Sequence, residues 1–142
     1  MNDEKLEKVM TLINKANKDF AASKNLIETD CEYYWDIICF HCQQCVEKSL
    51  KAFLMYNETD FPKTHDLIFL LNLCLKSDSD FKNFDLLEFA NYGVEIRYDD
   101  IPATLDETKN AFETAKTVMD YVKSYIDPES DLKRKSMSDE ND

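Results

Sequence analysis

Apolar residues recur every three or four positions along most of this chain, a spacing that predicts amphipathic helices. The pattern predicts helices over residues 3–27, 30–56, 64–75, 81–92 and 104–126. The first and last of these carry a single apolar stripe on a charged surface. Residues 30–56 are instead apolar around much of the helix circumference, which is typical of a helix at the centre of a bundle.

Local signals suggest where these helices begin and end. Thr29–Glu32 and Thr104–Glu107 both read T-x-x-E, a capping-box pattern that predicts the start of the second and fifth helices. Thr64 is the candidate N-cap of the third helix, and Gly93 is the candidate C-terminal stop of the fourth. Short polar connections between these segments favour antiparallel neighbours.

Glycine and proline are scarce, and this changes the class of fold that we consider. The chain has one Gly and three Pro, where average usage would give about ten and about seven. Pro62, Pro102 and Pro128 all fall between the periodic segments. We therefore expect an all-α, up-and-down bundle of about five helices over residues 1–126, with a disordered acidic tail over residues 127–142.

The charge balance limits the partners of the chain. Seventeen Lys and Arg face 29 Asp and Glu, giving a net charge of −12, which disfavours broad nonspecific binding to nucleic acid or membranes. The longest nearly unbroken apolar stretch, Leu67–Leu75, has nine residues, against about 20 for a bilayer span. With no basic and apolar leader at its start, the chain is expected to be soluble and cytoplasmic, with no membrane partner.

A polar flank of the second predicted helix is the first candidate site. Gln44, Glu47, Lys48 and Lys51 share this flank, and Glu47 is spaced for an ion pair with Lys51. One interpretation is a solvated helix face. The other is a phosphate site, in which Lys48, Lys51 and Arg97 supply charged hydrogen-bond donors.

Tracking the helix ends predicts which of these residues meet. If consecutive helices are antiparallel, Arg97 and His65 share one end of the bundle, with Lys51 about one turn down the second helix and Lys48 about two. His65 is then either a neutral base at a helix N-terminus or a hydrogen-bonding residue of the turn. His41, which lies between apolar residues, is expected to be structural.

The cysteines invite a metal interpretation, but their spacing disfavours it. Cys39, Cys42 and Cys45 repeat every three residues, so on one helix they cannot surround a tetrahedral ion, and we expect buried core residues. Five cysteines in a chain without an export signal indicate free thiols. A single glycine excludes Gly-rich phosphate loops, and we predict no metal site and no bound cofactor.

Three motifs together resemble the HEPN domain family. They are CFHCQQCVEKSLKAFL over Cys39–Leu54, FPKTHDL over Phe61–Leu67, and EIRY over Glu95–Tyr98. The resemblance spans roughly residues 5–126. It implies a small dimeric helical bundle that binds nucleotides, often encoded beside a small nucleotidyltransferase, and frequently part of a toxin–antitoxin or defence system.

Many members of that family are metal-independent ribonucleases with an Arg-x4–6-His motif. Arg97 matches the arginine of this motif, but the positions open to the histidine hold Pro102, Ala103 and Thr104. The resemblance therefore favours a binding protein over an enzyme, with no catalytic residue assigned.

From these motifs we expect a nucleotide-binding partner or regulator of a nucleotidyltransferase. The expected nucleotide-binding residues are Arg97, Lys48, Lys51 and His65. Two alternatives stay open: a ribonuclease that uses Arg97 and His65, and a purely structural interaction module.

Overall fold

The computed structural model describes residues 1–91 and 104–126, which fold into helices joined by short connections. In chain order these are α1 (Asp3–Asp30), α2 (Trp35–Tyr56), α3 (Leu67–Ser77), the 3-10 helix η1 (Ser79–Asn83), α4 (Leu87–Asn91) and α6 (Leu105–Ile126). The described residues contain no strand. The all-α helical bundle predicted from the sequence is confirmed.

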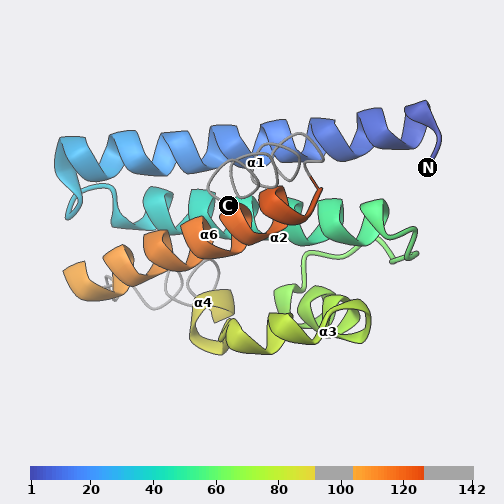
Figure 1. Cartoon of the computed structure of the whole chain (residues 1–142). Coiled ribbons are helices and arrows are strands. Elements are labelled where there is room, and N and C mark those ends of the chain that lie inside the picture. Colours follow the sequence, from blue (N-terminus) through green and yellow to red (C-terminus); the bar gives the residue numbers. More distant parts are fainter. Residues whose placement is uncertain (92–103, 127–142) are drawn as a thin grey trace, which may run out of the picture.

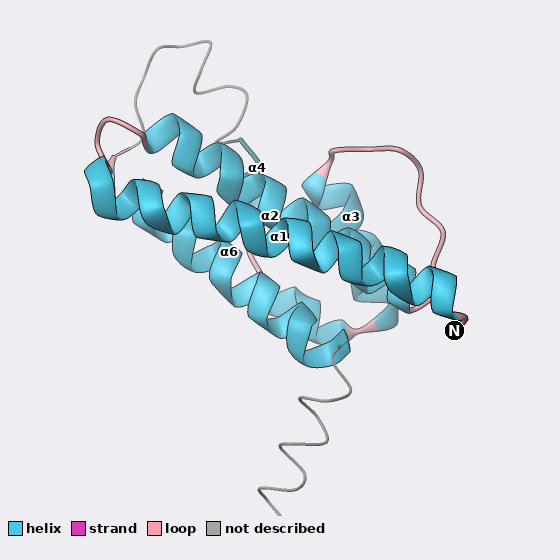
Figure 2. Cartoon of the chain, turned by 90° about the horizontal axis from the view of Figure 1, so that it is seen from above, coloured by secondary structure: helices cyan, strands magenta, loops and turns pink. Residues whose placement is uncertain are grey.

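The helices form an up-and-down bundle around α2. Helices α1 and α2 lie side by side and antiparallel, and α6 packs against both of them (Figure 1; Figure 2). The segment from α3 to α4 lies below them in the view of Figure 1. Because α2 contacts α1, α3 and α6, its predicted central position is confirmed.

The core is built from all of these helices, with α2 supplying the largest share. Nine apolar side chains of α2 are fully buried: Ile38, Cys39, Cys42, Cys45, Val46, Leu50, Ala52, Phe53 and Leu54. The Phe53 ring contacts the rings of Phe81 and Tyr125 at centroid distances of 4.6 and 4.8 Å. These contacts join α2 to η1 and to the end of α6.

The first predicted capping box is wrong. Helix α1 continues to Asp30, and the Thr29 hydroxyl donates to the carbonyl of Asn25 one turn earlier. A short turn follows and α2 begins at Trp35, with no side-chain cap on its first turn. The second T-x-x-E is confirmed, since Thr104 and Glu107 exchange side-chain to backbone hydrogen bonds of 3.1 and 3.2 Å at the start of α6.

The segment between α2 and α6 differs from the prediction at two points. Asp66, and not Thr64, caps α3, since its carboxylate accepts from the amides of Ile68 and Phe69. The single fourth helix predicted over 81–92 is replaced by η1 and the short α4, separated by residues 84–86. The Asp78 carboxylate caps η1 and also accepts from the Tyr121 hydroxyl, so this segment is fastened to α6.

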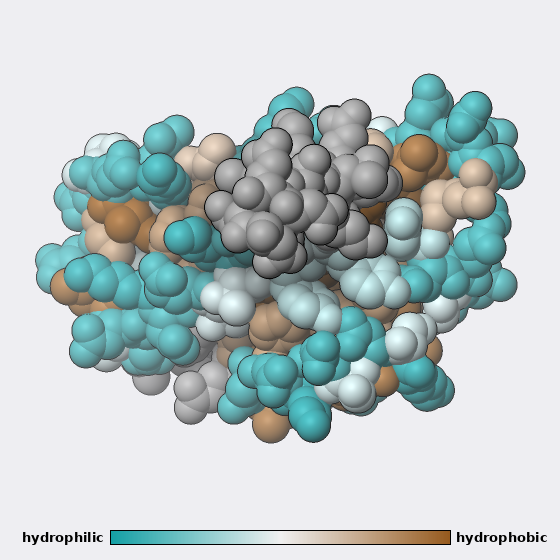
Figure 3. Space-filling view, viewed as in Figure 1, coloured by the Kyte–Doolittle hydropathy of each residue, from teal (hydrophilic) through white to brown (hydrophobic). Residues whose placement is uncertain are grey.

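Several predictions fall outside the described residues. These are the stop at Gly93, the Arg97-Tyr98 pair and the tail over residues 127–142. Within the described ranges, no helix combines the length and the apolar character needed to cross a bilayer. The face drawn in Figure 3 is largely hydrophilic, with apolar residues showing in hollows between the helices.

Candidate functional site

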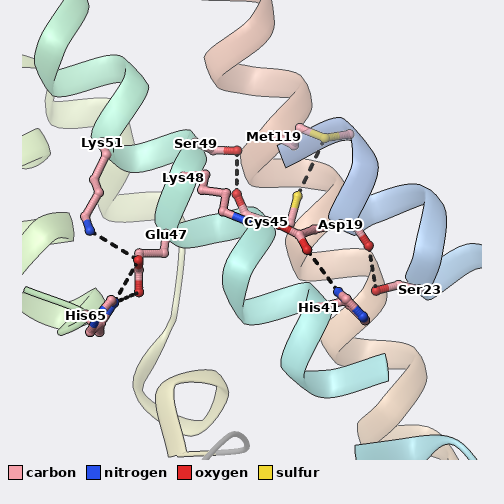
Figure 4. A network of polar contacts seen from close by, with 10 residues as sticks. All are labelled: Asp19, Ser23, His41, Cys45, Glu47, Lys48, Ser49, Lys51, His65 and Met119. Atoms are coloured by element: carbon pink, nitrogen blue, oxygen red, sulfur yellow. Dashed lines mark hydrogen bonds and ion pairs between the residues drawn. The ribbon is translucent and has the colours of Figure 1, made fainter. Parts of the chain in front are cut away.

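A nearly buried carboxylate lies in the middle of α2. Glu47 is only 6% exposed, and a charge in such a place needs partners. It has two, since Lys51 donates from Nζ to Oε2 at 3.2 Å and Nδ1 of His65 lies 3.0 Å from both carboxylate oxygens (Figure 4). The predicted ion pair between Glu47 and Lys51 is confirmed, but it is largely buried and not part of a solvated face.

The loop before α3 brings His65 to this carboxylate. The Asp66 cap fixes the start of α3, and the Thr64 hydroxyl accepts from the Asp66 amide. His65 therefore lies immediately before a fixed helix start, with its Nδ1 on Glu47 and its side chain 86% exposed. Because Nδ1 is committed to the carboxylate, Nε2 is the ring nitrogen available to a ligand.

Lys48 belongs to a second cluster, on the flank of α2 that faces α1. It forms an ion pair with Asp19 of α1, whose other oxygen lies 2.9 Å from Nδ1 of His41. Figure 4 shows Lys51 and His65 on one side of α2, and Lys48 and His41 on the other. The structure thus brings together Lys51 and His65 but does not bring Lys48 to them. The structural role expected for His41 agrees with its contact to Asp19.

Sequence reasoning missed Asp19, although a signal was present. Asp19 lies three residues after the buried Ala16 and four before the buried Ser23. A helix places positions with these spacings on one face. An acid on the buried stripe of α1 therefore predicts a basic partner on the helix packed against it.

Sequence reasoning also missed the role of Gln43, which lies one turn before Glu47 on α2 and binds the end of α4. Its side-chain amide donates to the carbonyls of Phe89 and Ala90 at 2.8 and 3.1 Å. The last carbonyls of a helix have no hydrogen-bond partner within that helix, and a side chain can supply one. The last described residues before Arg97 therefore lie against Gln43, which is one helical turn before Glu47 on α2.

This geometry changes the arrangement predicted from the helix ends. His65 contacts the middle of α2, beside Glu47, and not its C-terminal end. The loop of residues 57–66 runs back along α2, which the assumption of tight turns did not anticipate. Arg97 lies outside the described residues, so its predicted place beside His65 stays a prediction.

The cysteines are core residues with free thiols. Cys39, Cys42, Cys45 and Cys74 are buried, and Cys31 is half-buried. Burial raises the pKa of Cys39 to about 11 and that of each of the other three buried thiols to about 12, which keeps them protonated and unreactive at neutral pH. Within the described ranges, no group of three or more His, Cys, Asp or Glu could hold a metal ion.

The cluster of Glu47, Lys51 and His65 can act on an anion in a defined way. Glu47 holds the Lys51 ammonium and the His65 imidazole in place, and an imidazole with a proton on each nitrogen would present Nε2–H outward. Among the described residues, Lys51 uses one of its three N–H donors on Glu47, which leaves two for a ligand. A neutral His65 on the same carboxylate would present a lone pair at Nε2 instead, as a base does.

Comparisons with known proteins point to one family. The sequence model of the HEPN domain matches residues 9–125. The fold is similar to the crystal structure of an archaeal HEPN homologue, with a TM-score of 0.60 and 19% sequence identity, over 84% of this chain and 98% of that one. No curated protein sequence matches the chain.

Proposed function

Because this chain belongs to the HEPN domain family, we propose that it binds the phosphate group of a nucleotide beside Glu47. The observation that carries the proposal is the shared carboxylate. It holds Lys51 and His65 together while leaving the His65 side chain exposed. The expected role is that of a partner or regulator, since the Arg-x4–6-His motif of the family's ribonucleases lacks its histidine here.

The proposed site consists of His65 and Lys51, with Arg97 added from the sequence. Nε2–H of a protonated His65 and the free donors of Lys51 would bind phosphate oxygens, and a guanidinium can engage two oxygens at once. Lys48 is left out because Asp19 engages it on the opposite flank of α2. The end of α4 beside Gln43 supports including Arg97, which follows it by only a few residues.

Calorimetric titration of the full chain with ATP, GTP and AMP tests this site. We expect His65→Asn and Lys51→Met each to weaken binding about tenfold, the effect of losing one charged hydrogen bond. His41→Asn and Lys48→Met are matched controls, since they alter the same residue types on the Asp19 flank, and binding should stay within about twofold. Arg97→Gln should weaken binding as His65→Asn does.

Two outcomes of these titrations would contradict the proposal. Equal losses in the variants of both flanks would point to general charge and not to a site. No heat with any of the three nucleotides would favour a purely structural interaction module.

Cleavage of RNA is the second candidate function, and the contact between Glu47 and His65 favours it. A carboxylate on Nδ1 orients a histidine as a general base, with Nε2 free to take the proton of a ribose 2′-hydroxyl. Arg97 would then stabilise the phosphate in the transition state. Cleavage of an RNA oligonucleotide that His65→Asn and Arg97→Gln each abolish would establish this reaction, with the 2′-deoxy oligonucleotide as the control.

The partner and the assembly rest on the family resemblance. We propose a homodimer that acts with a nucleotidyltransferase, in the setting of a toxin–antitoxin or defence system. Light scattering should then give a mass about twice the 16.7 kDa of one chain, and a mass of one chain would contradict the dimer.

A further inference from the structure

A groove lies between α6 and residues 79–89, and none of its lining residues belongs to the cluster of Glu47, Lys51 and His65. It consists of two adjoining hollows of about 780 and about 340 Å³, which share Asn83, Phe84 and Thr117 in their lining. In Figure 3, apolar surface is recessed between hydrophilic rims on the face drawn.

One face of α6 forms a long wall of this groove. The lining residues of this wall are Asn110, Glu113, Thr114, Thr117, Asp120, Tyr121, Ser124 and Tyr125. They recur at helical spacing, and the distance from 110 to 124 corresponds to about 21 Å along the helix axis. About six residues of extended chain span that length, so the groove is longer than a single side chain or a small ion requires.

The lining is acidic along its whole length. Asp80 and Asp120 lie in the larger hollow, and Asp85 and Glu113 in the smaller one. No described Lys or Arg lines either hollow. None of these four carboxylates forms an ion pair with a described basic side chain, whereas four described lysines pair with carboxylates elsewhere.

Aromatic rings complete the larger hollow. Tyr121 is fixed, because its hydroxyl donates to Asp78 and its ring packs against Phe84 at a centroid distance of 5.6 Å. Tyr125, also in the lining, packs on Phe53 at 4.8 Å. Preordered rings beside carboxylates attract guanidinium groups through both charge and the ring quadrupole.

We propose that this groove binds an extended, arginine-containing segment of a partner protein. The four carboxylates, which form no ion pair with a described basic side chain, and the rings select a cation, and the length of the α6 wall selects a peptide over a small molecule. A chain with a net charge of −12 also attracts such a segment at long range. The proposal goes beyond nucleotide binding and shares no residue with that site.

The test uses a defined probe on the full chain. The probe is a fluorescein-labelled peptide of eight residues that alternates arginine and alanine, and its binding is measured by fluorescence anisotropy. We expect the paired substitution Asp80→Asn with Asp120→Asn to weaken binding about tenfold, as the loss of two charged contacts implies. Tyr125→Leu should weaken it about threefold, and amide shifts in NMR spectra should cluster at residues 83–84 and 113–124.

Matched controls separate a groove from general charge. Glu28→Gln with Glu32→Gln removes the same charge from exposed positions outside the groove lining, and binding should stay within about twofold. Thermal unfolding of every variant, followed by circular dichroism, shows that each one folds.

Four results would overturn the proposal. Equal weakening by the two paired substitutions would mean that net charge alone attracts the peptide. Equal binding of a peptide with citrulline in place of arginine, or no binding of either, would exclude arginine recognition. Displacement of the peptide by spermine at equal concentration would indicate a small-cation site.

Discussion

Two carboxylates, Glu47 and Asp19, each hold one lysine and one histidine on opposite flanks of α2. In both clusters the acid is the most buried member, with side-chain exposures of 7% for Glu47 and 12% for Asp19. An unpaired charge in such a place is costly, so each buried acid needs its basic partners. The difference lies in the histidine: His65 is 86% exposed, whereas His41 is 29% exposed. Only the Glu47 cluster therefore offers a well-exposed imidazole to a ligand.

Removing the charge of Glu47 should destabilise the fold. We expect Glu47→Gln to lower the free energy of unfolding by about 2 kcal/mol, between the values typical of exposed and fully buried ion pairs. The reason is that Lys51 stays mostly buried with a weaker acceptor. Urea denaturation at pH 7 measures this loss.

Glu58→Gln is the control for that experiment. Its ion pair with Lys5 is more than half exposed on the Glu58 side, so its loss should change stability by less than about 0.5 kcal/mol. Equal losses of unfolding free energy in the two variants would show that the buried Glu47 ion pair stabilises the fold no more than an exposed one.

At the scale of elements, two T-x-x-E strings lead to opposite outcomes. Thr104 caps α6 through a reciprocal pair of hydrogen bonds with Glu107, whereas Thr29 lies inside the last turn of α1. Packing of α1 accounts for the difference, because Leu26 and Ile27, just before Thr29, pack against the core and keep this last turn helical. Local capping signals thus have less weight than the burial of a helix face.

The two threonines allow a matched prediction. Thr104→Ala should cost about 1 kcal/mol of unfolding free energy, the usual value of an N-cap side chain. Thr29→Ala should change stability by less than about 0.5 kcal/mol, because its hydroxyl only back-bonds to Asn25. Urea denaturation of both variants measures the difference, and a larger loss for Thr29→Ala would contradict this assignment of the caps.

At the scale of the whole molecule, burial of four thiols makes the stability of the fold depend on pH. The unfolded thiols ionise around their ordinary pKa of 9.0, whereas the folded ones do so at about 11 for Cys39 and about 12 for the other three. Their contribution to stability is therefore complete below pH 9. It is lost between pH 9 and about 12, since the unfolded chain releases its protons first.

Alkaline denaturation tests this link. The free energy of unfolding should fall as the pH rises from 8 to 10.5. Cys74→Ala, which lacks one of these thiols, should lose about 2 kcal/mol less than the parent over that range. Comparing pH dependences removes the constant effect of the missing sulfur atom, and identical slopes would mean that the Cys74 thiol is accessible in the folded chain.

The sequence by itself determined the helical class, the central position of α2, the cap of α6 and the pair of Glu47 with Lys51. All of these depend on helical periodicity or on residues three or four positions apart, and such relations are fixed within one helix. Cys39, Cys42 and Cys45 likewise follow their prediction, because small apolar side chains at helical spacing are buried.

Only the tertiary structure decided which flank of α2 each cation faces. Lys48 and Lys51 differ by three residues, yet Asp19 of α1 engages the first and Glu47 engages the second together with His65. Those contacts depend on how α1 and the loop of residues 57–66 pack on α2, and no short-range pattern encodes this packing. The acidic groove has the same origin, since its two walls come from segments that are distant in sequence and that meet only when the core closes.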